Sequence, residues 1–423
     1  MKARMKVVVR GVTYCLLLSC LLCSCVEEYW PELEEVHDGS IVVDGRISNV
    51  PGSYSVKLSN AISFDQETVV PVTGASVYII DNEGNRESLF EELPGSYVTT
   101  DPNFVGIIGR SYKVEINLPS GKSYESAFEE LMAPIGIESV GFEEDDVIID
   151  ETLGTTQKGY QFSITTEESA NDKNYFYWEL IETYEYHADY KIQYYFEGLR
   201  DFLSQGPENL PAATEFHRTL YECWATDTVK QFFSFGTDQL NVTKIENQPL
   251  HFMAYDNKKL EFGYSLLAHQ FTISESAYLF IKGLQEQNST TGEFYTSQPY
   301  QIVGNIKNVN DDNEVALGYF MVVGAAEPER IFTRKPPGSV VPDNNYEVTC
   351  GVATYNNEYV ARLTNLINRS GPENWPIFVG QILVAQGEGV LNLVPTWAAL
   401  SYSCVDCRRQ GGVKDKPSFW IDF

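Results

Sequence analysis

The feature that most constrains the fold of this chain is a succession of short segments in which apolar and polar residues alternate, each closed by turn-forming residues. The segments SIVVDGRIS, ASVYIIDNEGN and SYKVEINLPSGKSYES show this pattern, with DNEGN and PSGK as turns. Alternation with a period of two places every second side chain on one face of a strand, and Gly, Asn, Asp and Pro favour tight turns. Residues 38–134 are therefore predicted to form a small N-terminal β-sandwich.

The remaining sequence, residues 135–423, is also mainly strand-like. One exception is SESAYLFIKGLQEQ, whose apolar residues recur at helical spacing and whose Ser274 is suited to cap the first turn. We therefore expect a mainly β protein, in which the sandwich is followed by a larger β-rich domain with a few helices.

An aromatic face is predicted for the strand KNYFYWELIETYEY. Trp178, Tyr184 and Tyr186 lie at even spacing and so on one side of it. Tyr and Trp rings offer a large contact area at low entropic cost and can stack on sugar rings, so this face could be a ligand platform. Alternating aromatic side chains usually face the core of a sandwich, so the core interpretation is favoured and the ligand platform is the alternative.

Residues 1–24 have the pattern of an export signal. Four basic residues (Lys2, Arg4, Lys6 and Arg10) precede an apolar run over 11–23, and this run is shorter than the ~20 residues that span a bilayer. Lipoprotein signals end in an aliphatic residue, small residues and the cysteine that receives the lipid. Cys20 and Cys25 both fit, and Cys25 is favoured because polar sequence follows it at once. Ordinary cleavage without lipid is the alternative.

An acidic tether, residues 25–37, follows this cysteine. Its glutamates are Glu27, Glu28, Glu32, Glu34 and Glu35. The run resembles the export signal behind the lipidated cysteine of Bacteroidota surface lipoproteins, although a merely solvated linker would have the same composition. The expected location is the outer membrane, with a lipid anchor and the protein facing the cell exterior.

The charge balance excludes one class of function. The chain has 30 Lys and Arg against 59 Asp and Glu, a formal net charge of −29. Contacts with nucleic-acid phosphates need Lys and Arg, so a nucleic-acid partner is not expected.

Four of the eight cysteines follow the candidate lipidation site Cys25: Cys223, Cys350, Cys404 and Cys407. An even number in an exported chain predicts disulfides. Three pairings are possible, and the sequence does not choose between them. The CVDC segment also fits a redox pair or a metal site, but it lacks the surrounding pattern and the further ligands that these require.

Thr228 is a candidate for O-glycosylation. It lies in DTV, residues 227–229, which resembles the short sequon of an acidic residue, Thr and an aliphatic residue used in Bacteroidota. An ordinary turn threonine is the alternative.

Several motifs together resemble the Bacteroidota outer-membrane lipoprotein family called domain of unknown function 4249. They are VVDGRIS, GASVYIIDNEG, LPGSYVT, ECW, GNI, LGYF and the terminal CVDCRRQGGVKDKPSFW. The N-terminal strands are also similar to the immunoglobulin-like regulatory β-sandwich of carboxypeptidases. The resemblance implies an accessory lipoprotein beside a TonB-dependent transporter and assigns no catalytic residue.

No motif predicts a catalytic residue, a cofactor or a metal site, since the five histidines form no recognised ligand pair and no nucleophile elbow or phosphate loop is present. Two functions remain. The favoured one is a non-catalytic surface module that binds a glycan or peptide or assists a TonB-dependent transporter in nutrient uptake. The alternative is an exported hydrolase acting on glycans or peptides.

Overall fold

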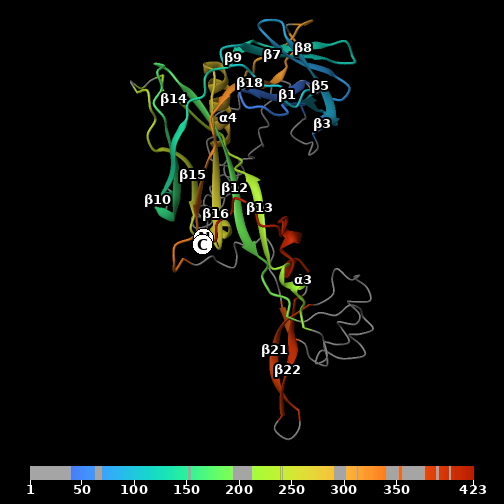
Figure 1. The fold of residues 1–423 in the computed structure, drawn as a ribbon, viewed down its shortest axis with the longest axis vertical. Coiled ribbons are helices and arrows are strands. Elements are labelled where there is room, and N and C mark those ends of the chain that lie inside the picture. The colour runs from blue at the N-terminus through green and yellow to red at the C-terminus, as the bar shows by residue number, and fades with distance from the viewer. Residues whose placement is uncertain are drawn as a thin grey trace, which may run out of the picture.

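The computed structural model describes residues 40–61, 69–150, 154–193, 212–238, 240, 242–289, 302–311, 313–339, 352–354, 377–386, 390–399 and 402–423. These residues form an elongated, mainly β molecule (Figure 1), as the sequence predicts. The N-terminal strands lie at one end of the long axis, and the hairpin of β21 (Ile377–Gln386) and β22 (Val390–Ala399) lies at the other.

The N-terminal end is a β-sandwich. Its N-terminal strands are β1 (Ile41–Ser48), β2 (Ser55–Asn60), β3 (Val70–Pro71), β4 (Ser76–Asp81), β5 (Arg86–Leu93), β6 (Ser96–Thr99), β7 (Ser111–Asn117), β8 (Ser123–Ser126) and β9 (Glu129–Glu130). Alternate residues such as Val43, Val56 and Val114 are fully buried and form one core. The DNEGN turn closes as expected, because the Asp81 carboxylate accepts hydrogen bonds from the backbone of Glu83 and Asn85.

Two strands from much later in the chain complete this sandwich. β18 (Leu317–Ala325) pairs in parallel with β1, and β17 (Ile306–Asn308) pairs with β8. Both come from the range assigned by sequence to the second domain. Phe320 and Val322 of β18 are fully buried in the N-terminal core. Folding of the sandwich therefore requires more of the chain than its N-terminal segment.

Three backbone segments approach one another closely where β18 enters. Gly318 has φ +88°, and a Cβ there would overlap the carbonyl oxygen of Val43. A Cβ on Gly304 would overlap the carbonyl oxygen of Gly318 in turn. Asn305 then hydrogen-bonds both backbone groups of Phe320, each at 2.9 Å. The GNI and LGYF segments thus interlock through backbone atoms, which only glycine permits at this spacing.

The middle of the molecule consists of two facing sheets. One contains β12 (Tyr175–His187), β13 (Glu222–Thr228), β14 (Phe233–Gly236), β16 (Gly263–Thr272) and β19 (Glu329–Thr333). It is continuous with the sandwich, because β18 pairs with both β1 and β16. The other contains β10 (Ile137–Asp150), β11 (Thr155–Thr166) and β15 (Gln248–Ala254).

Helix α4 (Glu275–Ser289) covers the second face of the β12–β16 sheet. Ala277 and Ile281 pack there against Tyr175, Tyr177 and Phe271. The Ser274 hydroxyl accepts a hydrogen bond from the backbone N–H of Ala277 at 3.1 Å, which confirms the predicted cap.

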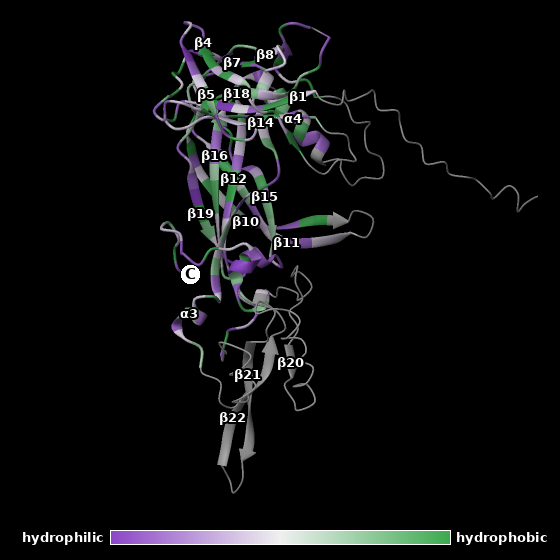
Figure 2. Ribbon diagram, turned by 90° about the vertical axis from the view of Figure 1, so that its right-hand side faces the viewer, coloured by the Kyte–Doolittle hydropathy of each residue, from purple (hydrophilic) through white to green (hydrophobic). Residues whose placement is uncertain are grey.

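Short elements occupy the far end. They are α3 (Glu215–Arg218), η2 (Lys258–Leu260), β20 (Val352–Thr354), η5 (Tyr402–Cys404) and η6 (Cys407–Gln410). Figure 2 shows α3 on the side of the middle sheets that is away from β4 and β7 of the sandwich. Of the helices in the described ranges, none has the length and hydropathy needed to cross a bilayer.

We predict that Gly318→Ala destabilises the protein much more than Gly121→Ala. Both glycines have φ +88°, but a Cβ at Gly121 meets nothing within 4 Å. Gly121→Ala should therefore cost only the backbone strain of about 1–2 kcal/mol, whereas Gly318→Ala must also separate β18 from β1. Chemical denaturation of the two variants measures the difference, and equal destabilisation would contradict the role of the close approach.

Candidate functional site

The predicted aromatic platform is largely core. Trp178 is 1 % exposed and packs between the two facing sheets. Its indole N–H donates to Gln270 at 2.9 Å, and Gln270 donates to the carbonyl of Ile135 at 2.7 Å. A ligand cannot stack on a ring this deeply buried, so the platform interpretation is wrong for Trp178, which instead connects the middle sheet to the start of the second sheet.

The two tyrosines of the predicted platform are also packed against the protein. Tyr186 is 4 % exposed, donates to the carbonyl of Cys407, and burial raises its pKa to about 12. Tyr184 is half-buried, and Lys259 Nζ lies 5.2 Å from the centre of its ring. The alternating pattern correctly predicted that these three side chains share one face of the strand. It did not predict that a second sheet and the C-terminal segment cover this face.

Of the predicted disulfide cysteines, Cys223 and Cys407 form a bond that closes a separation of 184 residues. Cys404 is also disulfide-bonded. Cys350 lies outside the described residues, as does the proposed lipidation site Cys25. The Cys223–Cys407 bond attaches η6 to β13, where the backbones of Trp224 and Val413 also pair.

Thr228 is the last residue of β13, directly opposite Ile181, and it is exposed. It lies at a strand end rather than in a turn. An exposed hydroxyl is accessible to a transferase, and glycosylation at this position stays a prediction.

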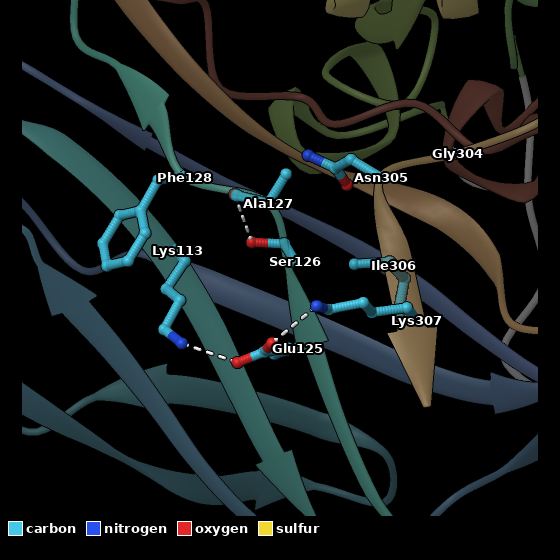
Figure 3. A pocket seen from close by; sticks show the side chains of 9 residues that line it. All are labelled: Lys113, Glu125, Ser126, Ala127, Phe128, Gly304, Asn305, Ile306 and Lys307. Atoms are coloured by element: carbon cyan, nitrogen blue, oxygen red, sulfur yellow. Dashed lines mark hydrogen bonds and ion pairs between the residues drawn. The ribbon is translucent and has the colours of Figure 1, made fainter. Parts of the chain in front are cut away.

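An open hollow lies beside β17, at the end of the strand order in the continuous sheet (Figure 3). It encloses about 470 Å³. Glu125 bridges Lys113 at 2.6 Å and Lys307 at 3.0 Å, and these hydrogen bonds, Lys113 foremost, hold the pKa of Glu125 below its ordinary value. Phe128 is 48 % exposed, and Lys113 Nζ lies 5.2 Å from the centre of its ring. Two lysines, one glutamate and one aromatic ring suit a polar ligand with an anionic group or a protein side chain.

Sequence reasoning did not identify this hollow. Lys113 and Lys307 come from strands far apart in the chain, and only the return of β17 to β8 brings them together. In the sequence, the only indication of this hollow was that Lys307 and Glu125 are charged residues within predicted strands.

A buried polar group lies between the two middle sheets. Glu182 is 3 % exposed, forms an ion pair with Lys259, and accepts a hydrogen bond from Tyr264 at 3.2 Å. Burial raises the pKa of Tyr264, and the Glu182 charge adds to the effect. Because Glu182 is paired and shielded from solvent, this arrangement is structural.

His251 lies near the same lysine. Burial, and then the charge of Lys259, lower its pKa to about 4. Neither ring nitrogen has a hydrogen-bond partner among the described residues, and the ring stacks on Phe162.

One group of side chains in the described part of the chain has the composition of a metal site. Glu185, His187 and Glu222 place three ligand atoms within 4.8 Å of one another. The sequence contained the Glu185–His187 pair in EYH, but Glu222 joins them only through the register of β12 and β13.

The fold and these sites define a class: an elongated β protein whose sandwich shares one continuous sheet with a second layered unit and whose described surface carries an open, charged hollow. The chain belongs to the family described as "Domain of unknown function (DUF4249)", whose sequence model matches residues 26–329. This match extends beyond β18, the strand that completes the sandwich.

Comparison with curated proteins gave no significant match. One similar solved structure is a DUF4785 family protein from Legionella pneumophila, with 9 % sequence identity and a TM-score of 0.19. The match covers 55 % of this chain and 52 % of that chain, so it spans about half of the length of that protein. A likeness at this TM-score carries no argument about function.

We predict that substitutions of Cys223 and Cys407 lower the melting temperature non-additively, because the two residues share one disulfide bond. Loss of a native disulfide typically costs about 2–5 kcal/mol, so Cys223→Ala and Cys407→Ala should each lower Tm by several degrees. The double variant should melt at the same temperature as the single variants, because the bond can be lost only once. Additive losses in thermal unfolding would show that the two cysteines act separately.

We predict that His251→Phe reduces the loss of folding stability that the protein undergoes as the pH falls. The pKa of His251 is about 4 in the fold against about 6.5 in an unfolded chain, so the unfolded state binds more protons as pH falls from about 6.5 towards 4. Wild type should lose about 2 kcal/mol of stability by pH 5 through this group, and the variant none of it. Urea unfolding at pH 7 and pH 5 compares the two proteins, and a difference independent of pH would contradict the assignment.

Proposed function

We propose that the protein is a surface-exposed outer-membrane lipoprotein, anchored through Cys25, that acts as a non-catalytic binding or accessory module for a TonB-dependent transporter. The export signal, the acidic tether and membership of the DUF4249 family support this proposal. The N-terminal sandwich serves as a display module, in the manner of the regulatory sandwich that its strand pattern resembles.

The observation that carries the proposal is the position of the tether on an elongated body. Only residues 26–40 separate Cys25 from β1, and β1 lies in the sandwich at one end of the long axis (Figure 1). An extended chain of ~15 residues spans at most about 50 Å. A lipid on Cys25 therefore keeps the sandwich near the membrane and leaves the opposite end free to reach outward.

The hollow at Lys113, Glu125 and Lys307 belongs to the sandwich and therefore lies in the anchored half of the molecule, within reach of a neighbouring transporter in the same membrane. A shallow, charged hollow with one exposed aromatic ring offers modest affinity. Anchoring both proteins in one membrane raises their effective concentration, so modest affinity suffices.

We predict that Cys25 is the lipidated residue. Cys25→Ala should move the protein from the membrane to the soluble fraction, while Cys20→Ala should leave it in the membrane. Mass spectrometry of the mature N-terminus should show an acylated Cys25. An unmodified N-terminus, or one that starts at Cys20, contradicts this assignment.

The location and the partner are tested together in the native host. Protease treatment of whole cells should degrade the protein, and tagged protein should co-purify a TonB-dependent transporter from solubilised outer membranes. Replacing the tether glutamates by glutamine should abolish surface exposure but leave the lipid. Lys307→Glu should weaken co-purification, and Lys122→Glu, in a turn of the same sandwich, is the matched control. Resistance to protease together with no transporter above the level of a control lipoprotein would overturn the proposal.

A further inference from the structure

The ends of β12 and β13 bring one imidazole and two carboxylates together. His187 lies directly opposite Glu222 in the antiparallel pair, and Glu185 lies two residues before His187 on the same face of β12. Their ligand atoms all lie within 4.8 Å of one another, and His187 Nε2 is 2.9 Å from Glu185 Oε1. Two ligands of a tetrahedral zinc ion lie about 3.3 Å apart, so small rotations of the glutamate side chains suffice to place all three around one ion.

His187 is the only side chain in the described ranges that forms an ion pair with either carboxylate, and it does so with Glu185. Within the described residues, neither Glu185 nor Glu222 forms an ion pair with Lys or Arg, whereas carboxylates such as Glu125 and Glu182 do. Glu261 and Asp189 add negative charge around the neighbouring Tyr221. Two lysines lie on this side of the molecule: Lys191 Nζ is 4.4 Å from the centre of the Tyr221 ring, and the charge of Lys258 acts on Asp189. Two adjacent carboxylates without a counter-ion repel each other, and a bound cation would remove this repulsion.

Aromatic packing fixes the orientation of the imidazole. The His187 ring stacks on the Phe262 ring, with the two ring centres 3.6 Å apart. The centre of the Tyr221 ring lies 4.7 Å from that of His187. The side chains of His187 and Glu185 are each 17 % exposed, and Glu222 is exposed. The group is thus held on a rigid pair of strands with one side open to solvent, as a pre-organised metal site requires.

We propose that Glu185, His187 and Glu222 bind a divalent transition-metal ion, with zinc as the best match. Calcium and magnesium prefer all-oxygen sites, whereas an imidazole nitrogen combined with carboxylates suits zinc and its first-row neighbours. Three protein ligands leave a coordination position for water or an external ligand. Glu222 is next to Cys223 of the Cys223–Cys407 disulfide on β13. A bound ion would therefore link the end of β12 to the part of β13 that the disulfide already holds. This inference does not depend on the proposed transporter partnership.

The test uses the full mature protein after treatment with chelator, and zinc as the probe. Calorimetric titration should show one zinc ion per chain and an increase of Tm on binding. Glu222→Gln and His187→Gln should each weaken binding at least about tenfold, since loss of even an outer-shell partner costs that much. The exposed Glu222 makes its variant safe for folding.

Glu261→Gln is the matched control, because it removes one negative charge near Tyr221 without removing a proposed ligand. It should leave zinc affinity within a factor of a few. The inference is overturned if wild type shows no saturable zinc binding, if neither ligand variant weakens it, or if Glu261→Gln weakens it as much as Glu222→Gln. Tighter binding of calcium than of zinc would also overturn it, because the imidazole would then not be a ligand.

Discussion

The close contact of three backbones at Gly304, Gly318 and Val43 is the constraint on which the rest of the structure depends. It allows β18 to pair with β1 inside the sandwich and then, within a few residues, with β16 in the middle sheet. Two asparagines hold this strand. Asn305 hydrogen-bonds both backbone groups of Phe320, and Asn49 does the same for Ala325. An amide side chain that donates and accepts in this way replaces a missing strand partner, and it satisfies backbone groups that would otherwise be buried without one.

Further interactions at the same junction make the two parts of the molecule one body. Arg46 of β1 pairs with Glu179 of β12 at 2.7 Å and lies over the ring of Phe271. Glu129 of β9 accepts hydrogen bonds from Ser276 of α4 and from Tyr319 of β18. The hollow beside β17 and the ends of β12 and β13 are therefore held on a common framework, so both sites are fixed relative to the point where the tether leaves the sandwich.

The sequence predicted local structure well and long-range structure poorly, for physical reasons. Alternation and turn residues predicted the sandwich strands, and helical spacing with Ser274 predicted α4, because these signals act between near neighbours. The same alternation could not tell whether the Trp178 face is covered, since coverage depends on β10, β11 and β15. The pairing of Cys223 with Cys407 and the meeting of Glu222 with His187 depend on register between distant segments. From the sequence, the GNI and LGYF segments were only features of the family resemblance. The structure explains their glycines, because the backbones of Gly304 and Gly318 approach too closely to leave room for a Cβ.

The parallel pairing of β1 with β18 has a consequence for the order in which the protein can be made. Asn49 and its partner Ala325 are 276 residues apart, and a chain emerges from the ribosome, or from a translocation channel, with its N-terminus first. Until residues beyond 325 have emerged, β1 lacks a neighbour on one side and Phe320 is missing from the core. The first strands therefore remain an incomplete sheet with an unpaired edge, which favours slow folding and exposes a surface that holdase chaperones can bind. A chain with this topology stays threadable through a narrow channel for most of its length, because the part that emerges first cannot close until the part that emerges late has arrived.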